Sequence, residues 1–158
     1  MLRRLVILSL ALVSLACGKS YFEGPTGPVD PATQSFAPSL NVEISSMNRT
    51  ASGLYYRDRN VGQGQIAASG DSVRAHYTGW LPDGLRFDTS RGADPLYFKL
   101  GVGSVIRGFD EGLVGMRVGG VRQLVIPSNL AYGSSPNGNI PRYSNLVFEI
   151  ELMEVKKP

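Results

Sequence analysis

The stretch Ser-Val-Ile-Arg-Gly-Phe-Asp-Glu-Gly, residues 104–112, predicts a short amphipathic helix. Ile106, Phe109 and Leu113 recur at i, i+3 and i+7, a spacing that places three apolar side chains on one helical face. Ser104 belongs to the residue types that cap the start of a helix, so we expect the helix to begin directly after it. The apolar face of such a helix has to be buried against another element of the fold.

The segments on either side of this helix have the patterns of strands and turns. Apolar side chains alternate through residues 146–153, as in a half-buried strand, and the turn-rich segment 128–145 is long enough to be a functional loop. We therefore expect an α+β fold, with an antiparallel sheet of about five to six strands wrapped around one short helix and any pocket opening beside that helix. The segments with strand patterns, from which these five to six strands are expected, are residues 41–47, 53–61, 72–79, 86–88, 96–100, 121–126 and 146–153.

Composition limits the classes of protein to which the chain can belong. With 158 residues and 42% hydrophobic residues, it fits one domain with a full core. The formal net charge is +3, without a basic run beyond the leader, which argues against binding to nucleic acid. A single cysteine excludes an internal disulfide, and no Cys/His cluster has the spacing of metal ligands. A hydrolase is not expected, because its catalytic base would have to be the one histidine, His76. No metal or cofactor is expected either.

Residues 1–16 have the features of a secretory signal peptide. Arg3 and Arg4 form a positive start, and the apolar run that follows is too short for a stable membrane span. Cys17 stands at the expected cleavage point in an arrangement that resembles a bacterial lipobox, and this resemblance implies a lipid on Cys17. Ser14 occupies a position where the motif usually has leucine, so an ordinary secreted protein remains the alternative.

A lipid on Cys17 would hold the protein at a membrane surface while its folded part stays in water. We expect the bacterial cell envelope as its location, at the periplasmic face and on the outer membrane, because Gly18 replaces the aspartate that often signals inner-membrane retention. Residues 17–40 are rich in Gly and Pro, which predicts a flexible tether without a dimerising helix. The folded domain is expected to cover residues 41–158 and to be monomeric.

Several short blocks stand in a fixed order between about Gly70 and Val155. They are Val73–Gly79, Asp83-Gly84 with Phe87–Ser90, Val105–Phe109, Ile126-Pro127 with Ala131–Gly133, Ile140-Pro141, and Leu146–Leu152. In order and spacing these blocks resemble the FKBP-type peptidyl-prolyl cis-trans isomerases, and the resemblance covers more than half of the chain. It implies an antiparallel sheet around one short helix, which the patterns predict independently.

The resemblance also implies a pocket for a substrate proline, with two departures from the usual pattern. Phe109 stands where many members have a tryptophan as the pocket floor, and Leu96 stands where an aromatic often lines the wall. We expect these two departures to alter substrate preference and inhibitor affinity more than the activity itself. At the rim, the Tyr132 hydroxyl and the backbone N–H of Ile106 are expected to donate to substrate carbonyls. The implied catalytic residues are Tyr77, Phe87, Asp88, Phe109, Tyr132 and Phe148, and the implied substrate-binding residues are Leu96, Val105, Ile106 and Ile140.

Rotation about an X-Pro bond needs no nucleophile, so an apolar pocket can catalyse it. The barrier is about 18–20 kcal/mol because amide resonance is lost as the bond twists, whereas the cis and trans states differ by only about 0.5–1 kcal/mol. The twisted amide is less polar than the planar one, so a dry aromatic box favours it. The resemblance implies proline-containing polypeptides and unfolded proteins as partners, and macrolide-type molecules as inhibitors.

The same residues also have plain structural interpretations. The strand aromatics fit a simple core, Asp88 fits a turn that it closes itself, and Tyr132 fits a surface aromatic packed on its own loop. A proline-recognising module or chaperone with little turnover is the alternative function, although the 15 residues between Tyr132 and Phe148 leave no room for an inserted domain. A third alternative, an envelope scaffold lipoprotein, predicts a filled pocket. By strand parity His76 points away from Tyr77, so it is expected to be structural or exposed.

Overall fold

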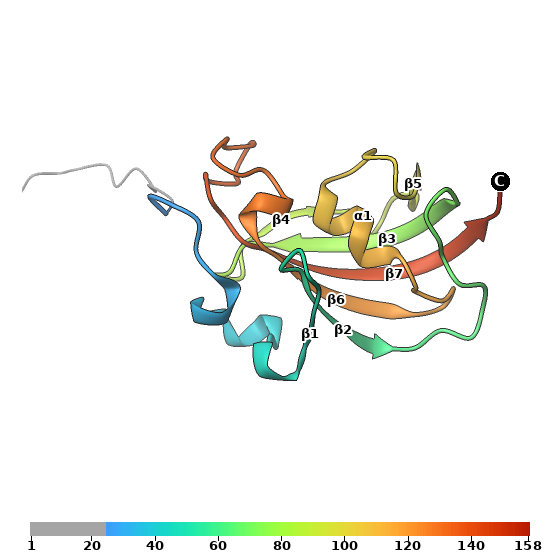
Figure 1. The fold of residues 1–158 in the computed structure, drawn as a ribbon, viewed down its shortest axis with the longest axis horizontal. Coiled ribbons are helices and arrows are strands. Elements are labelled where there is room, and N and C mark those ends of the chain that lie inside the picture. The colour runs from blue at the N-terminus through green and yellow to red at the C-terminus, as the bar shows by residue number, and fades with distance from the viewer. Residues whose placement is uncertain (1–24) are drawn as a thin grey trace, which may run out of the picture.

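The computed structural model describes residues 25–158, and in this part of the chain one antiparallel sheet curves around one α-helix (Figure 1). This confirms the α+β fold, and the two-residue strand β1 brings the sheet to seven strands. The expected signal peptide and Cys17 lie outside the described residues. The elements are β1 (Asn48–Arg49), β2 (Tyr55–Asn60), β3 (Ser72–Trp80), β4 (Arg86–Thr89), β5 (Leu96–Lys99), α1 (Arg107–Leu113), β6 (Val121–Ile126) and β7 (Leu146–Lys156).

Strands β3 and β7 form the centre of the sheet. The spatial order is β1-β2-β6-β7-β3-β4, and β5 also pairs with β3. The C-terminal half of β3 pairs with β4, whereas its N-terminal half pairs with β5. The two short strands therefore share the same edge of the sheet, and side chains from both can face the helix.

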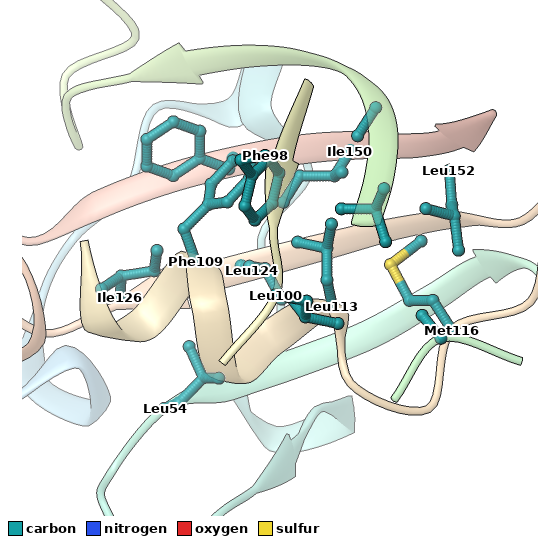
Figure 2. Packing of buried hydrophobic residues seen from close by; sticks show 14 of the residues in the cluster. Leu54, Phe98, Leu100, Phe109, Leu113, Met116, Leu124, Ile126, Ile150 and Leu152 are labelled. Carbon is teal, nitrogen blue, oxygen red and sulfur yellow. The ribbon is translucent and has the colours of Figure 1, made fainter. Parts of the chain in front are cut away.

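Helix α1 lies across the concave face of the sheet, as its apolar spacing predicts (Figure 1). Phe109 and Leu113 are buried, and they point into the cluster of apolar side chains that the sheet supplies (Figure 2). Two glycines bring the helix directly onto β6, because a Cβ atom on Gly108 would collide with Ile126 and one on Gly112 would collide with Leu124. At these two positions the helix backbone therefore packs directly on the side chains of β6.

The start of the helix differs from the prediction. It begins at Arg107 with Ile106 in the N-cap position, and no side chain caps it, so Ser104 does not have the expected role. The buried carboxylate of Asp110 accepts the backbone N–H groups of Gly101 at 2.6 Å and Gly103 at 3.0 Å. These bonds fold the preceding turn onto the first helical turn, where an acidic group also suits the helix dipole.

A buried arginine holds the other end of the helix. Arg122 on β6 donates through Nη1 to the carbonyl of Gly112 at 3.0 Å and to that of Val114 at 3.3 Å. Its charge is balanced by Asp58 on β2, whose Oδ1 lies 2.7 Å from the Arg122 Nε. The last carbonyls of the helix, which lack intrahelical partners, are thus satisfied from the sheet.

The segment before β1 is packed on the sheet. The sequence predicts a flexible tether to residue 40 and then a strand over 41–47, but the structure has three 3-10 helices, η1 (Pro31–Thr33), η2 (Pro38–Leu40) and η3 (Ile44–Ser46). Leu40 is buried with side chains from the outer face of the sheet, namely Tyr55, Val125 and Val147. Sparse apolar residues suffice here because the sheet provides the rest of this second core.

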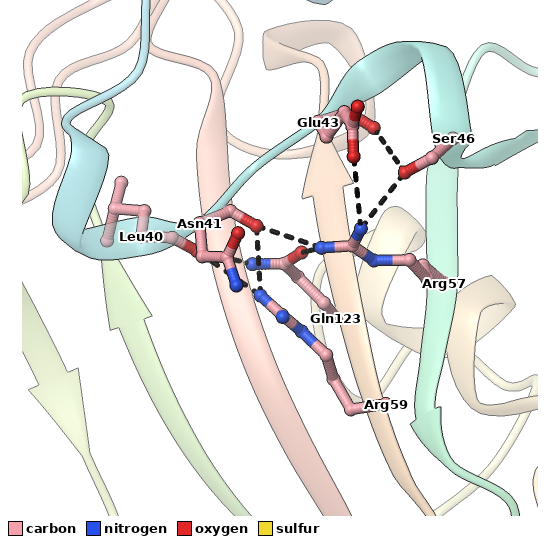
Figure 3. Close-up of polar contacts among 7 residues, drawn as sticks. All are labelled: Leu40, Asn41, Glu43, Ser46, Arg57, Arg59 and Gln123. Atoms are coloured by element: carbon pink, nitrogen blue, oxygen red, sulfur yellow. Dashed lines mark hydrogen bonds and ion pairs between the residues drawn. The ribbon is translucent and has the colours of Figure 1, made fainter.

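Polar side chains of β2 and β6 also hold this segment (Figure 3). Gln123 donates through Nε2 to the Leu40 carbonyl at 2.8 Å, and Arg57 and Arg59 donate to the Asn41 carbonyl at 2.8 Å and 3.0 Å. The Arg57 guanidinium also donates to the Ser46 hydroxyl at 2.9 Å. The end of η2 and the following turn are therefore fixed to the outer face of the sheet.

Candidate active site

Four aromatic rings from four elements meet beside the N-terminal end of α1. The Phe109 and Phe148 ring centroids lie 5.3 Å apart, those of Tyr77 and Phe109 5.7 Å apart, and those of Phe87 and Phe148 5.5 Å apart. All three pairs are close to perpendicular, the edge-to-face arrangement that aromatic pairs prefer. Phe109 and Phe148 are 3% and 5% exposed, whereas Tyr77 and Phe87 are half-buried. We call these four rings the aromatic cup.

Gly79 makes room for the cup and was missed by the sequence analysis as a site residue. It lies two residues after Tyr77 on β3 and directly opposite Phe148 of β7. A Cβ atom at this position would lie 2.6 Å from Cζ of Phe87 and 2.7 Å from Cε1 of Phe148. A glycine inside a strand often marks such a close approach, and this signal was available from the sequence.

The polar edge of the cup is formed by Tyr77 and Asp88. The Tyr77 hydroxyl donates to Asp88 Oδ2 at 2.6 Å, and the backbone N–H of Thr89 donates to Oδ1 at 2.8 Å. Burial raises the pKa of the Tyr77 phenol, and the hydrogen bond to the Asp88 carboxylate raises it further, with a smaller contribution from neighbouring Tyr132. The phenol therefore stays protonated and keeps donating to Asp88, whose side chain is exposed at the rim.

The remaining site residues that the resemblance implied lie in or against the core cluster that also contains Phe109 and Phe148. Ile140 is buried in the core cluster that contains Phe109 and Phe148. Four more pack against that cluster and are half-buried: Leu96, Val105, Ile106 and Tyr132. The structure therefore links Asp88 to the cup through Tyr77 and places these five residues in or against the same apolar core as Phe109 and Phe148.

The long loop that carries Tyr132 and Ile140 has internal order. Asn137 and Ile140 exchange backbone hydrogen bonds of 3.0 Å and 2.9 Å, and the N–H of Tyr143 donates to the Gly133 carbonyl at 2.7 Å. These bonds cross the loop in two places. The loop therefore has a defined shape beside the cup.

One aromatic neighbour of the cup was not predicted. Phe98 on β5 is buried, and its ring centroid lies 5.9 Å from that of Phe109. It follows Leu96 by two residues, so strand parity places both on the face that looks toward the helix. Phe98 thus supplies an aromatic ring in the region where Leu96 replaces the usual one.

The one histidine lies outside the cup, as its strand parity predicts. Its Nδ1 atom is 3.1 Å from the Ser90 hydroxyl. Arg91 pairs with Glu151 at 2.7 Å on a part-exposed surface, and Glu151 is the residue opposite the histidine on the neighbouring strand. Within residues 25–158, no group of three His, Cys, Asp or Glu side chains is placed to hold a metal ion, and no helix is long and apolar enough to cross a membrane.

The sequence profile of the FKBP-type peptidyl-prolyl cis-trans isomerases matches residues 63–153. The chain belongs to this family. The matched range runs from just before β3 almost to the end of β7, so it includes the helix and every ring of the cup. The residues ahead of position 63, including the 3-10 segment on the outer face, lie outside the family match.

The relatives of this FKBP domain differ greatly in length. The FK506-binding protein of Neisseria meningitidis serogroup B is 47% identical over 105 residues, which are 65% of this chain and 96% of that protein. FK506-binding protein 4 of Neurospora crassa is 41% identical over 138 residues, or 87% of this chain. This chain spans only 28% of the length of that fungal protein.

Solved structures of FKBP proteins share the fold. FkpA from Escherichia coli has a TM-score of 0.66 and 39% identity, and the match covers 76% of this chain and 55% of that one. AtFKBP13 has a TM-score of 0.64 and 41% identity, covering 69% of this chain and 98% of that one. The fold is therefore FKBP-like, as the sequence blocks implied.

Proposed function

We propose that this FKBP is a peptidyl-prolyl cis-trans isomerase that acts on X-Pro bonds of proteins folding in the cell envelope. The observation that carries the proposal is the aromatic cup, with Tyr77 hydrogen-bonded to Asp88 at its edge. The cup is apolar, and its outer rings keep part of their surface open to solvent. A proline ring is apolar and compact, so it suits such a site.

The cup lowers the rotation barrier because it keeps water away from the amide. Water stabilises the planar amide because resonance separates its charges, and the twisted amide has lost part of that polarity. With the proline ring held against Phe109 and Phe148, the bond turns where water does not reach. The rim supplies the remaining contacts: Ile106 precedes the first helical turn, where backbone N–H groups lack intrahelical partners, and Tyr132 carries a hydroxyl. Both donate to peptide carbonyls beside the proline.

The role of Asp88 follows from its hydrogen bond. By accepting from the Tyr77 hydroxyl, it fixes the orientation of that ring, and the Thr89 N–H in turn fixes the carboxylate. The wall of the cup therefore keeps its shape when a peptide enters. In this proposal Phe109, Phe148, Tyr77 and Phe87 contact the substrate directly.

The envelope location rests on the leader of the chain. Residues 1–16 resemble a signal peptide and Cys17 stands in a lipobox-like context, so the mature protein is proposed to carry a lipid at Cys17 on the outer membrane. The carbonyl of Val29 accepts from Asn145 Nδ2 at 3.1 Å, which joins this part of the chain to the folded domain. The intervening residues, fully extended, span at most about 40 Å. The cup would thus work on chains that fold close to the membrane surface.

Proline-containing segments of unfolded proteins are the proposed substrates. Macrolide-type molecules are the proposed inhibitors, because relatives of this chain are named as FK506-binding proteins. A macrolide that fills the cup should compete with the peptide. Competition therefore offers a test of where the peptide binds.

The proposal is tested by the rate of cis-trans isomerisation of a short X-Pro peptide. Phe109→Ala removes the floor and Asp88→Leu removes the partner of Tyr77, so each should lower kcat/KM by about tenfold or more, equivalent to ~1.4 kcal/mol. Tyr97→Ala and Asp94→Leu are matched controls at exposed positions, and both should keep the wild-type rate. Unchanged rates in both cup variants would count against the proposal.

A second candidate is a proline-recognising module with little turnover. The half-exposed Tyr77 and Phe87 rings favour it, since an apolar cup can hold proline without accelerating rotation. This candidate predicts measurable affinity for unfolded chains together with an isomerisation rate equal to that without protein. The peptide assay separates the two functions directly.

A further inference from the structure

A second hollow opens at the end of the sheet where β3 turns into β4. It has a volume of about 420 Å³, within the range of about 300–1,000 Å³ that ligand sites occupy. Its apolar lining comes from three separate parts of the chain: Phe36 and Ala37 of the N-terminal segment, Leu81 and Pro82 of the β3–β4 turn, and Pro141 of the long loop. We call this space the apolar hollow.

Hydrogen bonds between these parts hold the walls of the hollow in place. The Ala37 N–H donates to the Pro82 carbonyl at 2.7 Å, which joins the N-terminal segment to the turn. Asn145 lines the hollow, is 1% exposed and bridges two parts of the chain. Its Nδ2 donates to the Val29 carbonyl at 3.1 Å, and its Oδ1 accepts from the Ser128 N–H at 3.2 Å. The hollow is therefore preformed.

The hollow is connected to the core around the aromatic cup through shared segments of the chain. Ile140 belongs to the same core cluster as Phe109 and Phe148, and the next residue, Pro141, lines the hollow. Leu81, another lining residue, belongs to the same core cluster as Phe148. An extended chain advances about 3.3–3.6 Å per residue. The proposed path of a bound polypeptide from the cup to the hollow follows Ile140 and Pro141.

We propose that the apolar hollow is a second binding subsite for the unfolded polypeptide whose proline occupies the cup. It accepts one or two apolar side chains that lie a few residues from the proline. The inference rests on the proposed isomerase function and extends it, because it predicts a preference for proline segments with apolar neighbours. Asp83 at the edge of the hollow adds a negative charge, which disfavours acidic neighbours.

The test compares two substrates in the full chain. One is a tetrapeptide that reaches only the cup, and the other carries the same X-Pro core extended on both sides by leucine-containing segments. Ser35→Trp places a large ring at the hollow, whereas Ser39→Trp places the same ring on the same segment outside it. Both serines are exposed. Ser35→Trp should raise KM for the long peptide by about tenfold, matching the ~1.4 kcal/mol lost when about two methylene groups stay in water.

The outcomes separate the subsite from the isomerase function. The inference requires that Ser35→Trp leave the tetrapeptide kinetics unchanged and that Ser39→Trp leave both substrates unchanged. An equal loss for both peptides, or no loss for the long one, overturns it. A wild-type chain that fails to isomerise even the tetrapeptide refutes the proposed function itself.

A second measurement does not depend on the variants. A benzophenone side chain placed a few residues from the proline of the long peptide, on each side in turn, should crosslink to residues 34–37 or 141–144 of the wild-type chain. A macrolide that fills the cup should abolish this crosslink. Crosslinks confined to other surfaces would overturn the subsite.

Discussion

At the scale of single residues, Gly79 decides whether the rings of the cup fit together. We predict that Gly79→Ala forces Phe87 and Phe148 apart, because the added methyl group would lie 2.6 Å and 2.7 Å from their rings. Overpacking of this kind costs about 1–3 kcal/mol. Urea unfolding should show that loss of stability, and kcat/KM for the X-Pro peptide should fall.

Gly27→Ala is the control, because no atom lies within 4 Å of the methyl group that it adds. Its stability and activity should match the wild type. A Gly79→Ala variant with wild-type activity would mean that the rings can move without loss, and that the cup does not depend on its present shape.

The Tyr77 phenol should stay protonated at alkaline pH, so its hydrogen bond to Asp88 should persist there. Burial raises the pKa of its phenol above the ordinary value of 10.0, and the bond to Asp88 adds to the rise. The stability that this group contributes is present below pH 10 and is lost only as the pH rises through the higher folded pKa. The difference in phenolate absorbance between wild type and Tyr77→Phe should therefore show no titration below pH 10, and a phenolate signal there would contradict the geometry.

Not all of the site could be predicted at this scale. The family resemblance implied site roles for Tyr77, Phe87 and Phe148, whereas their strand patterns alone predicted plain core residues. Phe98 was omitted, although it shares the parity of Leu96. The contact of Phe87 with Phe148 across Gly79 depends on strand pairing between β3, β4 and β7, which a single sequence does not show.

At the scale of elements, helix α1 is held by polar groups at both ends. We predict that Asp110→Asn loosens the turn before the helix, because the amide would present an N–H group to one of the two backbone donors of Gly101 and Gly103. One unsatisfied buried group costs about 1–3 kcal/mol. Both the urea midpoint and the affinity for the X-Pro peptide should fall, since this turn leads to Val105 and Ile106.

Asp94→Asn is the matched control at an exposed loop position, and it should behave as wild type. If Asp110→Asn kept the wild-type midpoint, the turn would be held by other contacts. If stability fell while KM stayed constant, the turn would have no part in positioning the rim.

Helices and strands could be predicted where the hydrophobic periodicity of the segment itself determines its structure. The strand 121–126 has the predicted bounds, and the helix and the last strand were found with small shifts at their ends. The strand expected over 41–47 was wrong. Leu40, Val42 and Ile44 pack on the outer face of the sheet, so their apolar character follows from a surface remote in sequence and not from strand alternation.

At the scale of the whole molecule, the N-terminal segment is part of the folded unit. We predict that a chain beginning at residue 48 is less stable than one beginning at residue 25 by about 3 kcal/mol or more, because Leu40 and its neighbours no longer cover Tyr55, Val125 and Val147. Urea unfolding of the two chains measures the difference. Equal midpoints would mean that the segment only rests on the sheet.

Amino-acid composition could not show that the folded unit begins before residue 40. Residues 25–40 contain the glycines and prolines of a linker, yet Pro31 and Leu40 are buried. The carbonyl of Leu40 accepts from Gln123, and its side chain packs with Val125 and Val147, all of which lie more than 80 positions away in the sequence. A linker-like segment becomes ordered when a preformed surface supplies both apolar cover and hydrogen-bond donors.

The most direct test of the aromatic cup is exchange NMR of an X-Pro peptide with the full chain. We predict faster cis-trans exchange in the presence of protein, together with nuclear Overhauser contacts between the proline ring and the ring protons of Phe109 and Phe148. Exchange at the rate of the free peptide, or proline contacts on another surface, would contradict it.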